Sequence, residues 1–544
     1  MLQKQSVQSW SAWLTALFFI LLIGIGLYAG LGYGQPWDEP WEQDILRLNG
    51  NQYLTALGQP ASFVMDSTMT PPASGLIADS EERDHGVSAY YPLLWLVGQT
   101  SLSPAQRMMI WHAYTWLWFM AGTGALWLIC RRLGLGRLLS SVAALFLSLS
   151  PRMFAEGHYN NKDMVLLSLV LLVVWLGLRL ADHPNVWRAA LFSLAGAIAA
   201  NTKIVGLGVW GLCALFVLTT LLAQRRMNGR AWGAAAVTLL AFSGFYLLLT
   251  PAMWADPLGF LRYLMVNAVD FTRWENDILY RGTIYHLTCE TLPRTYLPYM
   301  ILVTTPLWLL ALIGVGQVLA IARMFRRGAR PFVDGVSTAL LLCTLLWLFP
   351  LAYAVLGKPN MYNGWRHFYF VYGPLLIMAV YGVQRLSLRI RKKTPRRLAA
   401  GALALCLGLS AAGIAWEHPY QYAYYSPVLR NARLGERFEL DYWNVSVEDG
   451  LKRLYEAEKP TAQIPLRIAG ADPLTNLGLC NTHAVLPRAL RDAFVLTDAA
   501  DADYLLSNPT YAQIYLWEPS ENMRVAASVQ AYGQTLMLAY RVTR

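Results

Sequence analysis

Gln35-Pro36-Trp37-Asp38-Glu39-Pro40-Trp41-Glu42 follows directly on an apolar run from Leu14 to Leu31. A run of about 20 apolar residues is long enough to span a bilayer as a helix, so this stretch lies where a membrane helix leaves the lipid. Trp is favoured at that depth because its ring is apolar and its N–H stays hydrated. Carboxylates at that depth are costly unless a cavity, a cation or a ligand holds them. The stretch therefore predicts a polar site at a membrane boundary; a solvated loop within an aromatic belt is the simpler interpretation.

The composition is that of a polytopic membrane protein. Of the 544 residues, 56% are hydrophobic and 14% are charged, whereas soluble domains carry about 25% charged residues. Apolar runs recur from Leu14 to Ala415 and predict about 11 transmembrane helices. The net charge of +11 does not indicate nucleic acid, because basic residues cluster in short loops such as Arg385 to Arg397. Such loops lie in the cytoplasm under the positive-inside rule, and the N-terminus is expected on the same side.

Charge and hydropathy divide the chain into a membrane domain, residues 1–416, and a C-terminal domain, residues 417–544. Residues 32–108 form a long acidic loop that is expected outside the cytoplasm. The segment from Ala189 to Leu222 is interpreted as a hairpin turning at Asn201-Thr202-Lys203, because one long helix would place the next basic loop outside.

After Glu417 the apolar runs become short and charges become frequent. This pattern predicts a small α/β domain on the outer side. Strands are expected at Pro465–Gly470, Ala502–Leu506 and Val525–Val542, the last as a hairpin, and an amphipathic helix at Asp449–Glu458. Cys289 and Cys480 lie outside the apolar runs and could pair, although sequence alone does not show it.

The charged residues next to apolar runs fall mostly on the predicted outer side. Lys203 is a lone cation in a hairpin of small residues, where a charge costs on the order of 2.5–3.5 kcal/mol, so a partner is expected. Snorkelling to the interface is the alternative for Lys203, and an exposed loop cation is the alternative for Arg366. Cations gathered opposite a carboxylate predict an anionic lipid headgroup beside a general base, because Arg and Lys both bind phosphate.

These features resemble the GT-C glycosyltransferases, which use polyprenyl-phosphate sugars. The nearest branch is the bacterial relatives of the protein O-mannosyltransferases and aminoarabinose lipid A transferases, of the glycosyltransferase family 39 type. The resemblance is carried by Trp37-Asp38-Glu39, Ser150 to Asp163, Asn201-Thr202-Lys203, Gly364-Trp365-Arg366-His367, His418 to Tyr422 and Phe438 to Trp443. It implies a mainly α, GT-C-type bundle in the bacterial inner membrane, with a periplasmic C-terminal domain.

The resemblance implies that Asp38 is the catalytic carboxylate and that Lys203 holds the donor phosphate. We expect Asp38 to act as general base in an inverting transfer, with Glu39 supporting it or orienting the acceptor. Arg152, Lys203 and Arg366 are expected to neutralise the departing lipid phosphate. Glu156, His158, Lys162, Asp163 and His367 are expected to line the donor and acceptor sides.

The implied partners are a polyprenyl-phosphate-linked sugar, membrane lipid, and an acceptor lipid, glycan or protein. A divalent cation held by Asp38 and Glu39 is compatible with the sequence but is not required by it.

Two other classes of protein fit the same residues. A transporter or flippase of lipid-linked or anionic solutes would also gather charges in the membrane, although internal repeats and midplane sites are typical of that class. An inactive scaffold with a sensory external domain would place Asp38 and Lys203 far apart.

Overall fold

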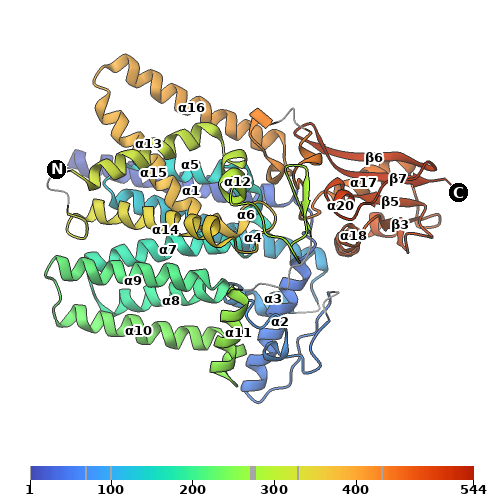
Figure 1. The fold of residues 1–544 in the computed structure, drawn as a ribbon, viewed down its shortest axis with the longest axis horizontal. Helices are drawn as coiled ribbons and strands as arrows, with labels where there is room; N and C mark the ends of the chain where they lie inside the picture. The colour runs from blue at the N-terminus through green and yellow to red at the C-terminus, as the bar shows by residue number, and fades with distance from the viewer. Residues whose placement is uncertain are drawn as a thin grey trace.

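The computed structural model describes residues 2–67, 70–98, 101–269, 277–326, 330–429 and 433–543. Long helices form a bundle, and a small domain that contains the main sheet projects from one end of it (Figure 1). The polar segments before α4 (Pro104–Arg132) and after α10 (Gly229–Leu249) lie at the same end as this domain (Figure 1). The fold class expected from the sequence is therefore confirmed.

Nine helices of the described chain are long and apolar enough to cross a membrane, or ten if one bent pair counts as a single span. The bent pair is α5 (Arg137–Ser148) and α6 (Pro151–Tyr159), which meet at 71°. The nine are α1 (Leu2–Gly30), α4 (Pro104–Arg132), α7 (Asp163–Asp182), α9 (Val205–Ala223), α10 (Gly229–Leu249), α13 (Leu307–Met324), α14 (Gly335–Gly357), η4 with α15 (Arg366–Val371 and Tyr372–Arg389) and α16 (Lys393–Trp416).

The remaining difference from the expected 11 spans is α8 (Val186–Thr202), which has 17 residues. At about 1.5 Å per residue it is shorter than the hydrocarbon core. It does form the first arm of the predicted hairpin, because α9 begins directly after Lys203 and Ile204. A further short helix, α12 (Tyr296–Thr304), precedes α13 and is separated from it at Thr305 and Pro306, as Pro disfavours a continuous helix.

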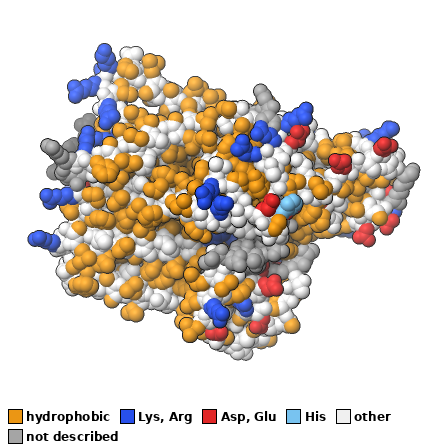
Figure 2. Space-filling model, in the orientation of Figure 1, with side chains coloured by type: hydrophobic (Ala, Val, Ile, Leu, Met, Phe, Trp, Pro, Cys, Tyr) orange, Lys and Arg blue, Asp and Glu red, His pale blue; other side chains and the backbone are white. Residues whose placement is uncertain are grey.

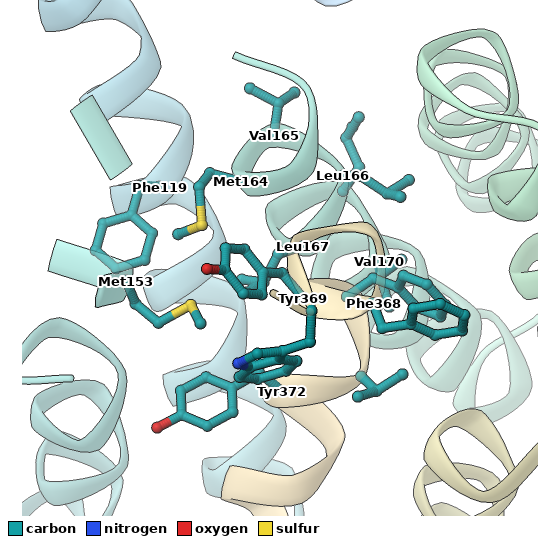
Figure 3. Close-up of a cluster of buried hydrophobic side chains, with 14 of the residues drawn as sticks. Phe119, Met153, Met164, Val165, Leu166, Leu167, Val170, Phe368, Tyr369 and Tyr372 are labelled. Atoms are coloured by element: carbon teal, nitrogen blue, oxygen red, sulfur yellow. The ribbon is translucent and has the colours of Figure 1, made fainter. Parts of the chain in front are cut away.

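The bundle is organised around α7, which is mostly buried, whereas α1 and α16 expose most of their side chains at its edge. Figure 3 shows the centre, where Met164 and Leu167 of α7 lie among Phe119, Met153 and Tyr369 from three other elements. The packing of α1 on α4 needs a glycine, because a Cβ on Gly26 would lie 1.8 Å from the Trp116 ring.

The surface carries the charge pattern of a membrane protein. Lys and Arg side chains project from the end that holds the N-terminus, Asp and Glu gather at the opposite end, and a broad hydrophobic band lies between them (Figure 2). A band of this kind is typical of a protein embedded in lipid, since soluble monomers rarely expose large apolar patches. The chain is a multi-pass membrane protein.

Short elements cover the end of the bundle that faces the C-terminal domain. They are α2 (Glu39–Ala56), η1 (Ile77–Asp79), η2 (Ser88–Leu93), α3 (Leu94–Gly98), η3 (Pro251–Met253), α11 (Pro257–Val269), β1 (Ile278–Tyr280), β2 (Thr283–Tyr285), η5 (Gln421–Ala423), η6 (Pro427–Leu429) and η7 (Leu434–Glu436). Within the long first loop, η2 and α3 follow one another directly and form two short helical segments.

The C-terminal domain has a five-stranded mixed sheet in the order β4-β3-β5-β7-β6. β3 pairs in parallel with β4 and β5, and β7 pairs antiparallel with β5 and β6. Its elements are α17 (Val447–Glu458), β3 (Leu466–Gly470), α18 (Pro473–Val485), α19 (Arg488–Arg491), β4 (Phe494–Leu496), β5 (Tyr504–Ser507), α20 (Pro509–Ile514), β6 (Met523–Ala531) and β7 (Gln534–Val542). The expected strands, the terminal hairpin and the amphipathic helix are all present.

Candidate active site

A cavity of about 750 Å³ lies where the short elements meet the bundle. Its polar part is lined by Asp38, Glu42, Glu82, Asp84, His85, Lys162, Lys203, Arg366 and His367, which come from five separate segments of the chain. Asp38, Lys162, Lys203, Arg366 and His367 were all candidates from the sequence, and in the structure all five line this cavity. The scaffold interpretation, which required Asp38 and Lys203 to be far apart, does not fit this geometry.

Asp38 is presented to the cavity by the start of α2. It is the N-cap residue, and Pro40 occupies the first turn, a position where Pro favours helix initiation. The Asp38 side chain makes no capping hydrogen bond to its own helix. Burial, with a smaller contribution from the Glu42 carboxylate, raises the pKa of the Asp38 carboxyl to about 7, although Arg366 and Lys162 act in the opposite direction.

Glu42, rather than Glu39, is the second carboxylate on this side of the helix. Residues i and i+4 share a helix face, so Glu42 lies on the same side as Asp38. Its Oε1 atom is 3.0 Å from the Lys162 ammonium and 3.6 Å from Nε2 of His85, and its Oε2 accepts a 3.3 Å hydrogen bond from Asn161. Burial lowers the pKa of Lys162, and Glu42 opposes this shift.

The sequence predicts that Lys203 has a partner, and in the structure that partner is Asp163. The Lys203 ammonium donates to Oδ1 of Asp163, and Nη1 of Arg366 lies 3.1 Å from Oδ2 of the same carboxylate. Asp163 is 1% exposed, whereas the Lys203 side chain is 25% exposed and the Arg366 side chain 9%. One buried carboxylate therefore orients two cations, and Lys203 is the more accessible of them.

Arg366 is further held by an aromatic cage. Its guanidinium lies 4.7 Å from the ring centroid of Tyr362, 5.2 Å from that of Tyr442 and 4.9 Å from that of Trp443. Nη2 donates to the Tyr442 hydroxyl at 3.3 Å. These contacts fix the guanidinium plane, so Arg366 offers a pre-oriented positive charge at the cavity wall.

The hairpin turn that carries Lys203 is itself fixed by Asn201. The Asn201 amide donates to the Thr250 hydroxyl at 3.0 Å and to the Leu249 carbonyl at 3.2 Å, and its oxygen accepts from the Ser88 N–H at 3.0 Å. The first loop, the hairpin and the end of α10 are thereby tied together beside the cavity.

Glu39 does not line the cavity. It is buried on the other side of α2, where Nε2 of His112 lies 2.7 Å from Oε2 and the Gln43 amide donates to Oε1 at 3.1 Å. Successive helical residues point about 100° apart, so the adjacent pair Asp38-Glu39 cannot face one ligand once α2 starts there. A metal or acceptor held jointly by the two carboxylates does not fit this geometry.

Three further candidates are core residues and do not line the cavity. Arg152 donates from Nε to the Tyr424 carbonyl at 3.1 Å and lies over the Tyr425 ring at 4.8 Å. Glu156 accepts from the Tyr369 hydroxyl at 2.6 Å. His158 stacks on Trp116 at 4.4 Å, and its Nε2 lies 2.9 Å from the Gly26 carbonyl oxygen.

The second part of the cavity is apolar and was not expected from the sequence. It is lined by Val205, Val209 and Leu212 of α9, Leu345, Leu346, Phe349, Pro350 and Tyr353 of α14, Leu264 of α11, and Phe368 and Phe370. Phe349 and Tyr353 are 56% and 53% exposed, so this part of the cavity opens to the outside of the bundle. Periodic apolar residues predict a helix but do not say which two helices leave a groove between them.

Other lining residues also went unassigned at the sequence level. Glu82, Asp84 and His85 come from the first loop, and Tyr442 and Trp443 from the segment that leads into the C-terminal domain. Only Phe438 to Trp443 carried a sequence signal, as part of the family resemblance. Within the described ranges, no group of three or more His, Cys, Asp or Glu side chains could hold a metal ion, and Cys289 and Cys480 are both free thiols.

The fold and this cavity define a multi-pass membrane protein with charged groups and an apolar channel in one site. No protein-family model and no curated protein sequence matches the chain. Among solved structures, it is similar to ArnT from Cupriavidus metallidurans in the apo state, with a TM-score of 0.51 and 14% identity over 98% of both chains. The structure of ArnT from the same organism bound to undecaprenyl phosphate gives a TM-score of 0.45 and 15% identity, over 96% of this chain and 97% of that one.

ArnT is an aminoarabinose lipid A transferase, so the resemblance read from the sequence is confirmed at the level of the fold. The chain has an ArnT-like fold along almost its whole length.

Proposed function

We propose that this protein is a membrane glycosyltransferase that moves a sugar from a polyprenyl-phosphate donor to an acceptor at the outer face of the inner membrane. The observation that carries the proposal is the cavity itself. A carboxylate, Asp38, and an accessible cation, Lys203, both line a space that continues into an apolar channel between α9 and α14. This combination matches a ligand with a sugar, a phosphate and a long hydrocarbon chain.

The hydrocarbon chain is assigned to the apolar part of the cavity. Its lining is aliphatic and aromatic, and the exposed rings of Phe349 and Tyr353 mark its opening toward lipid. A polyprenyl chain enters such a groove from the bilayer without crossing water, because both surroundings are apolar. The phosphate then lies where the channel meets the charged wall.

The donor phosphate is assigned to Lys203, with Arg366 beside it. Asp163 orients both cations, which lowers the reorganisation needed when negative charge develops on the departing phosphate. Arg366 is caged and nearly buried, so Lys203 makes the direct contact and Arg366 supplies a fixed field.

Asp38 is assigned as the general base in an inverting transfer. A base works best when its pKa lies near the operating pH, and burial raises the pKa of Asp38 to about 7. The carboxylate removes the proton from the acceptor hydroxyl or amine as the acceptor attacks the anomeric carbon. The bond to phosphate breaks in the same step, and the polyprenyl phosphate leaves with the electron pair. The acceptor is a lipid, a glycan or a protein.

The test is an assay of the purified protein with radiolabelled polyprenyl-phosphate sugars, followed by identification of the labelled product. Asp38→Asn is expected to abolish transfer and to leave binding of polyprenyl phosphate intact. Asp79→Asn, a change in the same loop that does not touch the cavity, is the matched control. Wild-type turnover by Asp38→Asn would exclude Asp38 as the base. If the label stays on the polyprenyl-phosphate sugar, and that lipid has crossed a proteoliposome membrane, the protein is a transporter instead.

A further inference from the structure

The residue immediately before Asp38 is held by the C-terminal half of the chain. The Trp37 N–H donates to the Trp443 carbonyl at 3.1 Å, and the Trp37 indole N–H donates to the Tyr442 carbonyl at 3.0 Å. The side-chain amide of Asn481, on α18, donates to the Trp37 carbonyl at 2.6 Å. All three polar groups of Trp37 are thus paired with residues more than 400 positions away.

The Asn481 contact acts on the peptide that joins Trp37 to Asp38. The carbonyl of Trp37 and the N–H of Asp38 belong to the same rigid plane, so a donor that fixes the oxygen also fixes the orientation of the Asp38 backbone. Trp37 is 4% exposed and Asn481 8% exposed. Water therefore has little access to replace the bond.

The C-terminal domain supports this contact from its own side. The Asn508 amide donates to the Asp441 carbonyl and to the Asn444 side chain, both at 2.7 Å, and Tyr511 donates to the Tyr442 carbonyl at 2.5 Å. One turn before Asn481, α18 packs so closely that a Cβ on Gly478 would lie 2.8 Å from the Cβ of Asn444. The helix that carries Asn481 is therefore held in a fixed position relative to the cavity wall.

We propose that Asn481 is a positioning residue that sets the Asp38 carboxylate through the Trp37 carbonyl, and that the C-terminal domain completes the active site in this way. The inference rests on the proposed function, since it concerns the base of that reaction. Asn481 does not line the cavity, so it acts on the rate of the chemical step and not on donor binding. A displacement of about 1 Å at a reacting group can cost on the order of 100-fold in rate.

The experiment measures kcat, the donor KM, polyprenyl phosphate binding and thermal unfolding for Asn481→Ala and Asn481→Asp. The Asp variant has almost the same shape but removes the donor, so it covers the case in which the Ala variant fails to fold. Asn522→Ala is the matched control, because Asn522 also donates its amide to a backbone carbonyl of this domain, that of Thr543 at 2.9 Å, away from the cavity.

We expect kcat to fall about 10- to 100-fold in the Asn481 variants, with donor KM and polyprenyl phosphate binding unchanged and Asn522→Ala equal to wild type. Wild-type kcat in the Asn481 variants would overturn the inference, and so would a parallel loss of kcat, donor binding and thermal stability. Wild type and Asp38→Asn are assayed in parallel, so that failure of the proposed function can be told apart from failure of the positioning role. If wild type transfers sugar, Asp38→Asn does not, and the Asn481 variants do, the positioning role alone fails. If wild type transfers no sugar, the proposed function fails and the positioning role fails with it.

Discussion

Lys203→Met separates a phosphate-binding role of Lys203 from a purely structural one. The substitution removes the ammonium and keeps most of the side-chain stem, so the packing of the hairpin turn is largely retained. A hydrogen bond to a charged group contributes about 1.5–3 kcal/mol. Since 1.4 kcal/mol corresponds to a factor of ten, the affinity for polyprenyl phosphate is expected to fall about 10- to 100-fold.

The same substitution also affects Asp163. Removing one partner of a buried ion pair costs roughly 3–5 kcal/mol when the other charge is left alone. Here Arg366 remains 3.1 Å from Asp163, and the Asn160 amide donates to the same carboxylate at 3.2 Å. The loss of stability is therefore expected to be smaller than that range, and the folded protein should persist for a binding measurement.

The assay compares polyprenyl phosphate with the uncharged polyprenol. If Lys203 contacts phosphate, Lys203→Met weakens binding of the phosphate and leaves binding of the alcohol unchanged. Lys452→Met is the control, because it also breaks a Lys–carboxylate ion pair, 2.9 Å from Glu448, outside the cavity. Equal losses for both ligands, or no loss for either, would refute the assignment and leave Lys203 as a structural partner of Asp163.

Three other predictions follow from the same geometry. The acid limb of the kcat/KM profile is expected near pH 7, with activity falling as the pH drops. The reason is that burial raises the pKa of Asp38 to about 7, and only its ionised form accepts a proton. A profile that is flat from pH 5 to 8 would contradict this. Burial raises the pKa of Glu439 to about 8, so the folded state binds its proton more tightly than the unfolded state and loses stability as the pH rises from about 4.5 to 8. Glu439→Gln should therefore flatten the dependence of Tm on pH over that interval, and an unchanged dependence would count against it. Arg152→Met should lower the free energy of unfolding by about 1.5–3 kcal/mol, because the hydrogen bond to the Tyr424 carbonyl is lost. The Kd for polyprenyl phosphate should not change. A higher Kd at unchanged stability would show that Arg152 contributes to the donor site.

Much of the architecture is readable from local patterns. Apolar runs, the basic loops between them and the change of composition after Glu417 predicted a bundle with a small α/β domain. Lys203 was also identifiable as a functional candidate, since a charge among small apolar residues requires a partner. Its partner, Asp163, was among the candidates, but the sequence did not say that the two would pair.

What the sequence determined by itself is the set of charged side chains whose placement at the membrane costs free energy: a carboxylate at the end of the first span and cations at the ends of later ones. Which of them share a cavity depended on helix phase and on long-range packing. The start of α2 turns Glu39 away from Asp38 and brings Glu42 beside it, and the bend between α5 and α6 leaves Arg152 and His158 in the core. Only the tertiary structure brings Asn481 to Trp37, because no local rule links residues 444 positions apart and the contact exists only when both domains have folded.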